Sequence, residues 1–139
     1  MTAVVFDSSI ALCWCFEDEV TQATQDLLER LRGNAAAVPN LWHVEIANVL
    51  ALAERRRRIT AAEIAQFIAL LEELEIEVDE ETWTLAFTRI LDLARAQRLT
   101  AYDAAYLELA MRLGVPLASK DADLCDAAER LGVSVLRAA

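Results

Sequence analysis

"AVVFD", residues 3 to 7, is the stretch from which we predict the fold class of this 139-residue chain. It is a short apolar run rich in β-branched residues that ends on an acid, as a buried strand does where it meets the surface. Similar runs occur at residues 35–39, 75–79, 115–119 and 133–137. Segments with helical apolar spacing occupy approximately residues 19–32, 41–57, 61–74, 80–96, 100–113 and 121–131. This alternation predicts an α/β fold, with a mainly parallel sheet covered by helices on both faces.

The run at residues 75–79, "EIEVD", differs from the other predicted strands because polar and apolar residues alternate strictly. Strict alternation is typical of a strand with one solvated face. We therefore predict that it is the least buried strand, and that its acids line a solvated edge.

Length and composition predict a single domain, residues 1–139, because there are only three glycines and two prolines and no linker-like tract. No apolar stretch free of charge reaches the roughly 18 residues that span a bilayer. The start of the chain has no basic segment and carries Asp7 within its apolar run, so we expect no signal peptide. Three cysteines without metal-ligand spacing suit a reducing compartment. We expect a cytoplasmic protein that does not enter the membrane.

The charge balance is strongly acidic, with 13 basic and 23 acidic residues and a net charge of −10. Taken alone, this argues against a simple electrostatic nucleic-acid binder. It does not exclude a site whose carboxylates hold divalent cations, because bound cations reverse the local potential that a phosphate meets. The positions of the acids therefore matter more than their number.

Two acids directly follow predicted strands. Asp7 ends the first run, and Asp121 lies just beyond the run at residues 115–119. In open parallel sheets, ligands bind outside the carboxyl ends of the strands. Asp7 and Asp121 are therefore expected at the same edge if their strands are parallel neighbours.

Glu45 interrupts the apolar pattern of the predicted helix at 41–57. The stripe with helical spacing consists of Leu41, Val44, Glu45, Asn48, Val49 and Leu52. A carboxylate on a core-facing stripe costs several kcal/mol unless something positive or proton-donating meets it. The alternative is that this helix is apolar nearly all round and that Glu45 reaches a surface edge.

Asp103 lies near the start of the predicted helix at 100–113. One interpretation is a capping box, with Thr100 as N-cap and Asp103 three residues later. The residues Tyr102, Tyr106, Leu109 and Leu113 predict a buried stripe on this helix. A capping acid on a closely packed helix can also face the edge of the sheet, so the structural and functional roles are compatible.

Four carboxylates from four elements, Asp7, Glu45, Asp103 and Asp121, are thus expected at one end of the sheet. Carboxylates held close together repel one another and raise one another's pKa unless a cation is present. Mg²⁺ and Mn²⁺ prefer such oxygen ligands, whereas one histidine, His43, and scattered cysteines do not form a typical zinc site. Ser8, Ser9 and Ser119 can supply hydrogen bonds that orient the acids.

The order of these motifs resembles the PIN-domain family, in particular the VapC-type toxins of toxin–antitoxin pairs, over nearly the whole chain. The four stretches are "VVFDSSIAL" (4–12), "VEIANVL" (44–50), "LTAYDAAYLELA" (99–110) and "LASKDADL" (117–124). The resemblance implies a three-layer α/β/α PIN-like fold with a mainly parallel central sheet of four to five strands. It makes Asp7, Glu45, Asp103 and Asp121 the catalytic metal ligands, supported by Ser9, Asn48 and Ser119. We prefer Asp121 to Asp123 as direct ligand because it is closer to the strand end; Asp123 remains an alternative ligand or a cap of the last helix.

The resemblance further implies an Mg²⁺- or Mn²⁺-dependent endoribonuclease that uses one or two ions per site. The expected partners are an RNA substrate, a cognate antitoxin protein and a second copy of the chain in a homodimer. Arg55, Arg56, Arg57, Arg58 and Lys120 are candidate contacts for RNA phosphates. The alternative for the arginine run is that it complements the dipole at the end of a helix and stays solvated. Trp14, Trp42 and Trp83 are expected in the core or a subunit interface rather than as base-stacking residues.

Two other functional classes fit the sequence less well. A phospho-acceptor signalling domain needs an acidic pair after the first strand and an aspartate after a middle strand, but Ser8 follows Asp7 and "AAAVPN" (35–40) contains no aspartate. A non-catalytic PIN-like binding module is the other alternative. The intact set of four acids argues against it, because a site without metal would gain stability by losing some of their repulsion.

Overall fold

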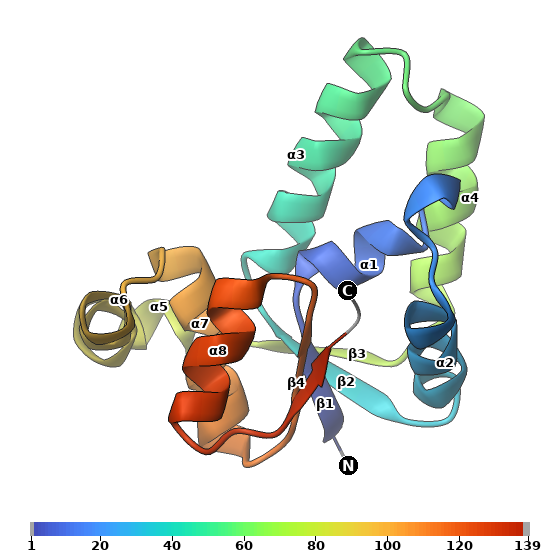
Figure 1. Cartoon of the computed structure of the whole chain (residues 1–139). Coiled ribbons are helices and arrows are strands. Elements are labelled where there is room, and N and C mark those ends of the chain that lie inside the picture. Colours follow the sequence, from blue (N-terminus) through green and yellow to red (C-terminus); the bar gives the residue numbers. More distant parts are fainter. Residues whose placement is uncertain (1, 138–139) are drawn as a thin grey trace.

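The computed structural model describes residues 2–137, so residues 1, 138 and 139 of the predicted domain lie outside its description. Its centre is a five-stranded sheet in the order β3-β2-β1-β4-β5 (Figure 1). All four strand pairs are parallel. The strands are β1 (Thr2–Phe6), β2 (Ala35–Pro39), β3 (Ile76–Asp79), β4 (Leu117–Ser119) and β5 (Val135–Arg137). The chain extends from β1 toward β3 on one side and returns to β4 on the other, so the order reverses between β1 and β4.

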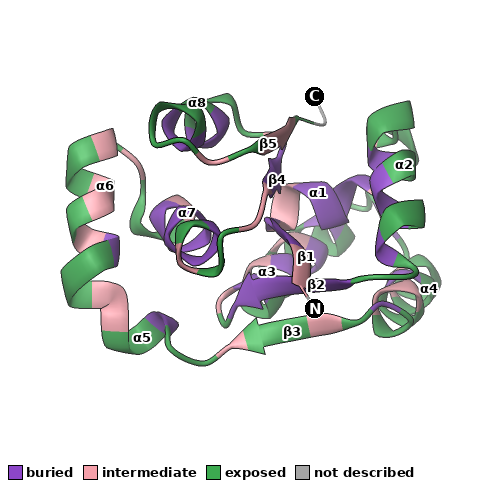
Figure 2. Cartoon of the chain, turned by 90° about the horizontal axis from the view of Figure 1, so that it is seen from below, coloured by how far each residue is buried: buried purple, intermediate pink, exposed green. Residues whose placement is uncertain are grey.

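Helices cover both faces of this sheet, as predicted. Figure 2 shows α7 and α8 on one side and α1, α2 and α4 on the other. The α-helices are α1 (Ser8–Cys13), α2 (Gln22–Leu31), α3 (Trp42–Arg55), α4 (Ala61–Glu72), α5 (Thr82–Leu85), α6 (Leu91–Gln97), α7 (Ala101–Leu113) and α8 (Ala122–Arg130). A short 3₁₀ helix, η1 (Glu17–Glu19), follows α1, and a π-helical turn, η2 (Ala86–Ile90), joins α5 to α6. The arrangement confirms the predicted α/β fold with a parallel central sheet.

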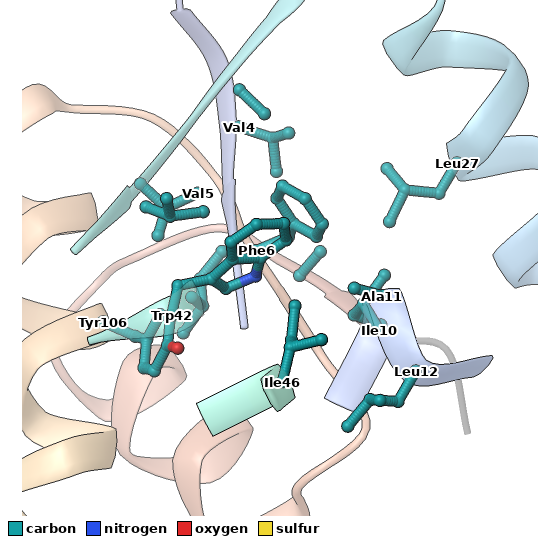
Figure 3. Close-up of a cluster of buried hydrophobic side chains, with 14 of the residues drawn as sticks. Val4, Val5, Phe6, Ile10, Ala11, Leu12, Leu27, Trp42, Ile46 and Tyr106 are labelled. Carbon is teal, nitrogen blue, oxygen red and sulfur yellow. The ribbon is translucent and has the colours of Figure 1, made fainter. Parts of the chain in front are cut away.

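The core forms where β1 meets α3 and α7. Val4, Val5 and Phe6 of β1 are fully buried. Trp42 of α3 packs edge-on against Phe6, with ring centroids 5.4 Å apart, and Tyr106 of α7 belongs to the same cluster (Figure 3). Burying large aromatic rings of this kind stabilises the fold strongly. The central strand and the first turn of α3 are therefore held firmly in place.

Helix ends follow their local sequence signals. Thr60 and Glu63 form a reciprocal capping box at the start of α4. Thr100 accepts a hydrogen bond from the backbone N–H of Asp103 at the start of α7, as the predicted cap requires. Gly114 ends α7 in the left-handed conformation, with φ of 66°. The Thr100 cap fixes the first turn of α7, on which the candidate acid Asp103 lies.

The predicted buried stripe of α3 is wrong. Val44 is 70% exposed and Asn48 is also exposed, while the buried side chains are Trp42, Ile46, Leu50 and Ala53. The helix is apolar nearly all round, so periodicity alone did not identify its inner face. Glu45 lies beside that inner face and is partly exposed. This partial exposure fits the alternative of a surface edge, and the hydroxyl of Tyr106 supplies the proton donor that the first interpretation required.

Three further expectations need correction. The stripe predicted on α7 is buried at Tyr106 and Leu109 but exposed at Tyr102 (63%) and Leu113 (41%), because the latter two lie in the terminal turns. Trp83 is 72% exposed, so of its two predicted locations the core is excluded and a subunit interface stays a prediction. The helix α1 was not predicted, because its apolar residues continue directly from those of β1.

The edge position of β3 is confirmed, but its acids are not uniformly solvated. Asp79 forms an ion pair with Arg112 of α7, with Nη2 and Oδ2 2.9 Å apart, and its side chain is 12% exposed. The partner arginine lies 33 residues away in sequence, which strand periodicity does not reveal. Among residues 2–137, no helix has both the length and the apolar character needed to cross a membrane.

Candidate active site

Four acids lie at the carboxyl edge of the sheet, and we call them the acidic site: Asp7, Glu45, Asp103 and Asp121. Asp7 directly follows β1 and Asp121 follows β4, and these strands are hydrogen-bonded neighbours. Glu45 lies in the first turn of α3, which follows β2, and Asp103 lies in the first turn of α7. The reversal of strand order between β1 and β4 is where open α/β sheets bind ligands.

The pKa of Asp103 shows that the four acids influence one another. It is raised from 3.8 to about 6, first by burial and then by the charges of Asp121, Asp7 and Glu45. Each of these negative charges disfavours the ionised form of Asp103. The structure therefore brings together the four acids that the sequence singled out.

Asp7 is the most firmly held of the four. It is only 4% exposed, and both of its carboxylate oxygens accept hydrogen bonds. The Ser9 hydroxyl donates to Oδ1 and the Ser119 hydroxyl to Oδ2, each at 2.5 Å, and the backbone N–H of Ile10 donates to Oδ1 at 3.3 Å. Burial raises the pKa of Asp7, while these donors favour its charged form and oppose the rise.

The same two serines connect β1 to the turn after β4. Ser9 accepts a hydrogen bond from the backbone N–H of Lys120 at 3.1 Å, and Ser119 accepts one from that of Asp121 at 2.9 Å. Each hydroxyl therefore donates to Asp7 and accepts from the segment that carries Asp121. Ser9 and Ser119 occupy the positions expected of supporting residues, and they fix Asp7 and Asp121 relative to each other.

Glu45 is oriented by a residue that sequence reasoning placed only in the core. The hydroxyl of Tyr106, on α7, donates a hydrogen bond to Glu45 Oε1. Burial raises the pKa of Glu45, and the Tyr106 hydroxyl opposes that rise. The signal available in the sequence was a tyrosine three residues after Asp103, on the same helical face. Asn48, predicted as a supporting residue, is exposed and its side chain forms no hydrogen bond within residues 2–137.

The start of α8 bears on whether Asp121 or Asp123 is the better candidate ligand. Asp121 is the N-cap, because its Oδ1 accepts a hydrogen bond from the backbone N–H of Leu124 at 2.9 Å. The alternative that Asp123 caps this helix is wrong. Both aspartates are exposed, but Asp123 lies two residues further from the strand, and the charge that acts on the pKa of Asp103 is that of Asp121.

The basic residues predicted to contact RNA divide into two groups. Arg58 donates to Asp18 and Glu19, and its guanidinium lies 3.9 Å from the ring centroid of Phe16. Lys120 forms an ion pair with Glu19 at 3.5 Å. By contrast, Arg55, Arg56 and Arg57 are exposed at the end of α3 and form no ion pair within residues 2–137. Arg58 and Lys120 therefore hold η1, and only the other three are free to meet a ligand.

The donor chemistry of the acidic site fits a divalent cation that prefers oxygen. None of its four carboxylates forms an ion pair with any residue from 2 to 137, so no side chain in that range neutralises them. Their arrangement is not yet a ligand cluster: over the same range, no three His, Cys, Asp or Glu side chains are placed to hold a metal ion together. The residues thus suit Mg²⁺ or Mn²⁺ in type, and binding requires the side chains to converge.

Comparisons with known proteins agree with this description. The family model of the PIN domain matches residues 4–130. The fold is similar to the crystal structure of PAE2754 from Pyrobaculum aerophilum, with a TM-score of 0.70 and 21% identity over 97% of this chain and 84% of that one. It is also similar to FitAcB from Neisseria gonorrhoeae, with a TM-score of 0.65 and 15% identity over 95% of each chain. No curated protein matches the chain by sequence.

The chain therefore belongs to the PIN-domain family, which confirms the resemblance seen in its motifs. PIN domains are generally nucleases, and they typically use divalent metal ions.

Proposed function

We propose that this protein is an Mg²⁺- or Mn²⁺-dependent endoribonuclease and the toxin of a toxin–antitoxin pair. The observation that carries the proposal is the acidic site itself, in which three neighbouring acids raise the pKa of Asp103 and no cation from residues 2–137 balances them. Membership of the PIN-domain family and the likeness of the four motifs to VapC-type toxins support the same activity.

In this proposal each acid has its own part. Asp7 is a buried anchor whose position is set by Ser9 and Ser119. Glu45, Asp103 and Asp121 are more accessible and complete the oxygen ligand set. A divalent cation bound there would supply Lewis acidity and an activated water for in-line attack on a phosphodiester. The side chains themselves orient the ligand and need not form a covalent bond to the substrate.

The partners follow from the same proposal. RNA is the substrate, and Arg55, Arg56 and Arg57 are the exposed cations available for its phosphates. An antitoxin protein and a second copy of the chain are the proposed protein partners. The exposed aromatic side chains Trp83 (72%) and Phe87 (90%) suit a protein interface, because large apolar side chains at a monomer surface often mark one. Light scattering of the purified chain tests the homodimer.

The decisive experiment measures cleavage of a mixed RNA pool by the purified chain with Mg²⁺, with Mn²⁺ and with excess EDTA. We expect cleavage only with a divalent ion, and a loss of at least about 100-fold in Asp103→Asn, because removing one ligand disrupts the ion that activates the water. Asp123→Asn is the matched control and should keep most of the activity. Cleavage that persists in EDTA would refute the metal mechanism, and transfer of a phosphoryl group to Asp7 would support the phospho-acceptor alternative.

A further inference from the structure

The hydroxyl of Tyr106 needs an explanation that packing does not give. The side chain is 1% exposed, and its ring belongs to the central core with Phe6 and Trp42 (Figure 3). A phenylalanine would supply the same ring without burying a polar atom. A buried hydroxyl costs free energy unless it is hydrogen-bonded, and the acceptor of this one is Glu45 Oε1.

The orientation of Glu45 depends on this single hydrogen bond, whereas the orientation of Asp7 is shared among several hydrogen bonds. Three donors hold Asp7, whereas within residues 2–137 the Glu45 carboxylate accepts a single direct hydrogen bond, from Tyr106. In that range, Ser8 is the one other hydroxyl that favours the charged form of Glu45. A glutamate also has one more rotatable bond than an aspartate, so it loses more rotamer entropy when it is fixed. Without the phenol, the partly exposed Glu45 side chain would sample several rotamers.

The helix α7 connects this contact to the rest of the acidic site. Asp103 and Tyr106 are three residues apart, which places them on neighbouring positions of one helical face. The same face therefore presents one acid directly and holds another acid, from α3, through a hydrogen bond. The bond uses one lone pair of Oε1, and within residues 2–137 Oε2 accepts no hydrogen bond, so the carboxylate keeps lone pairs for a ligand.

We propose that Tyr106 is a positioning residue that holds Glu45 in the orientation needed for metal binding; this rests on the proposed function of the acidic site. It acts through Glu45 and does not touch the substrate. Hydrogen bonds behind a metal ligand typically change metal affinity by about 10- to 100-fold when they are removed. The phenol stays a donor at neutral pH, because burial and the neighbouring carboxylate raise the pKa of Tyr106 well above its usual value.

The test compares Tyr106→Phe with Tyr102→Phe, which removes the hydroxyl of a tyrosine that is 63% exposed in the first turn of the same helix. Titration calorimetry with MnCl₂ should show a Kd about 10-fold weaker for Tyr106→Phe and a change below about two-fold for Tyr102→Phe. At saturating Mn²⁺, the kcat for RNA cleavage should return to within about three-fold of wild type with KM unchanged, because the defect lies in holding the ligand. In a Glu45→Ala background, Tyr106→Phe should not weaken Mn²⁺ binding further.

Three outcomes would overturn the role of Tyr106 and leave the proposed function of the acidic site intact. They are a wild-type-like Kd in Tyr106→Phe, an equal loss in Tyr102→Phe, and an undiminished loss in the Glu45→Ala background. Urea unfolding in EDTA distinguishes a structural role of the hydroxyl from a role in metal binding. A variant with reduced stability but an unchanged Mn²⁺ Kd would show that the hydroxyl serves only the fold. Absence of Mn²⁺ binding by the wild type would instead refute the proposed function.

Discussion

The helix α7 contributes residues to two groups of acids, one of which contains a cation and one of which, within residues 2–137, does not. Its first turn contributes Asp103 to the acidic site, and its last turns contribute Glu108 and Arg112 to a second group, the arginine cluster (Asp79, Glu81, Glu108 and Arg112). In the arginine cluster, the guanidinium of Arg112 lies 2.9 Å from a carboxylate oxygen of each of the three acids. The acidic site has no such cation within residues 2–137.

The pKa values of the two groups record this difference. Burial tends to raise the pKa of Asp79, but hydrogen bonds and charge from Arg112 bring it below its ordinary value. Burial also raises the pKa of Asp103, and there the surrounding acids increase it further, to about 6. A group of acids that serves the fold thus contains its own cation, whereas a group that lacks one is suited to binding a cation from solution.

Removing the cation of the arginine cluster should have the largest effect on the free energy of unfolding. Arg112→Leu leaves the buried carboxylate of Glu108 and the half-buried carboxylate of Asp79 without their cation, and breaking a buried ion pair in this way typically destabilises a protein by about 3–5 kcal/mol. Urea denaturation at neutral pH measures the change. The control is Arg95→Leu, at an exposed arginine of α6 that forms no ion pair with any residue from 2 to 137, and it should change stability by less than about 0.5 kcal/mol. Equal effects in the two variants would show that the ion pairs of Arg112 add nothing to stability.

Adding a cation to the acidic site should have the next largest effect. An ion that binds only the folded state at 100 times its Kd stabilises it by about 2.7 kcal/mol. Thermal unfolding with Mn²⁺ should therefore occur several degrees higher than in EDTA. Asp103→Asn should lose this shift, whereas Asp79→Asn, which neutralises an acid of the other group, should keep it. A shift retained by Asp103→Asn would remove Asp103 from the ligand set.

The two groups should also respond to pH with opposite signs in EDTA. Below pH 3.8, its ordinary pKa, Asp103 is protonated in both the folded and the unfolded chain. Between pH 3.8 and about 6, Asp103 is ionised in the unfolded chain but still largely protonated in the folded one. The free energy of unfolding therefore falls across this range as pH rises. Partial exposure limits the loss to about 1–2 kcal/mol. Asp79, whose pKa is lowered, instead contributes stability above its unfolded pKa that is lost as pH falls through the folded one.

Unfolding by urea from pH 3 to pH 8 measures both responses. Asp103→Asn should flatten the decline between about pH 4 and pH 6. Asp79→Asn should weaken the protein at neutral pH and reduce its loss of stability in acid. A decline between pH 4 and pH 6 that is unchanged in Asp103→Asn would assign it to Asp7 or Glu45, whose pKa values are also raised by burial.

The same comparison shows how far the sequence alone could be taken. Strand and helix order were predictable because apolar periodicity and caps such as Thr60 and Glu63 are local signals. The four acids were predictable because each interrupts an apolar pattern or follows a strand. The hydrogen bond from Tyr106 to Glu45 and the ion pair of Arg112 with Asp79 join residues 61 and 33 positions apart. Such contacts depend on the angles at which helices pack against the sheet, and no local pattern specifies those angles.

The smallest expected effect on the free energy of unfolding comes from the exposed acid of the arginine cluster, Glu81. The side chain of Glu81 is 69% exposed, whereas that of Glu108 is 5% exposed, although both lie 2.9 Å from Arg112. Exposed ion pairs typically contribute only about 0.2–1 kcal/mol because water screens them. Glu81→Gln should therefore reduce the free energy of unfolding by at most about 0.5 kcal/mol, and 0.5 M NaCl should remove most of the difference. Glu108→Gln should cost more and depend less on salt. If both variants behaved alike in urea denaturation, the cluster would owe its stability to the net charge around Arg112 rather than to buried pairs.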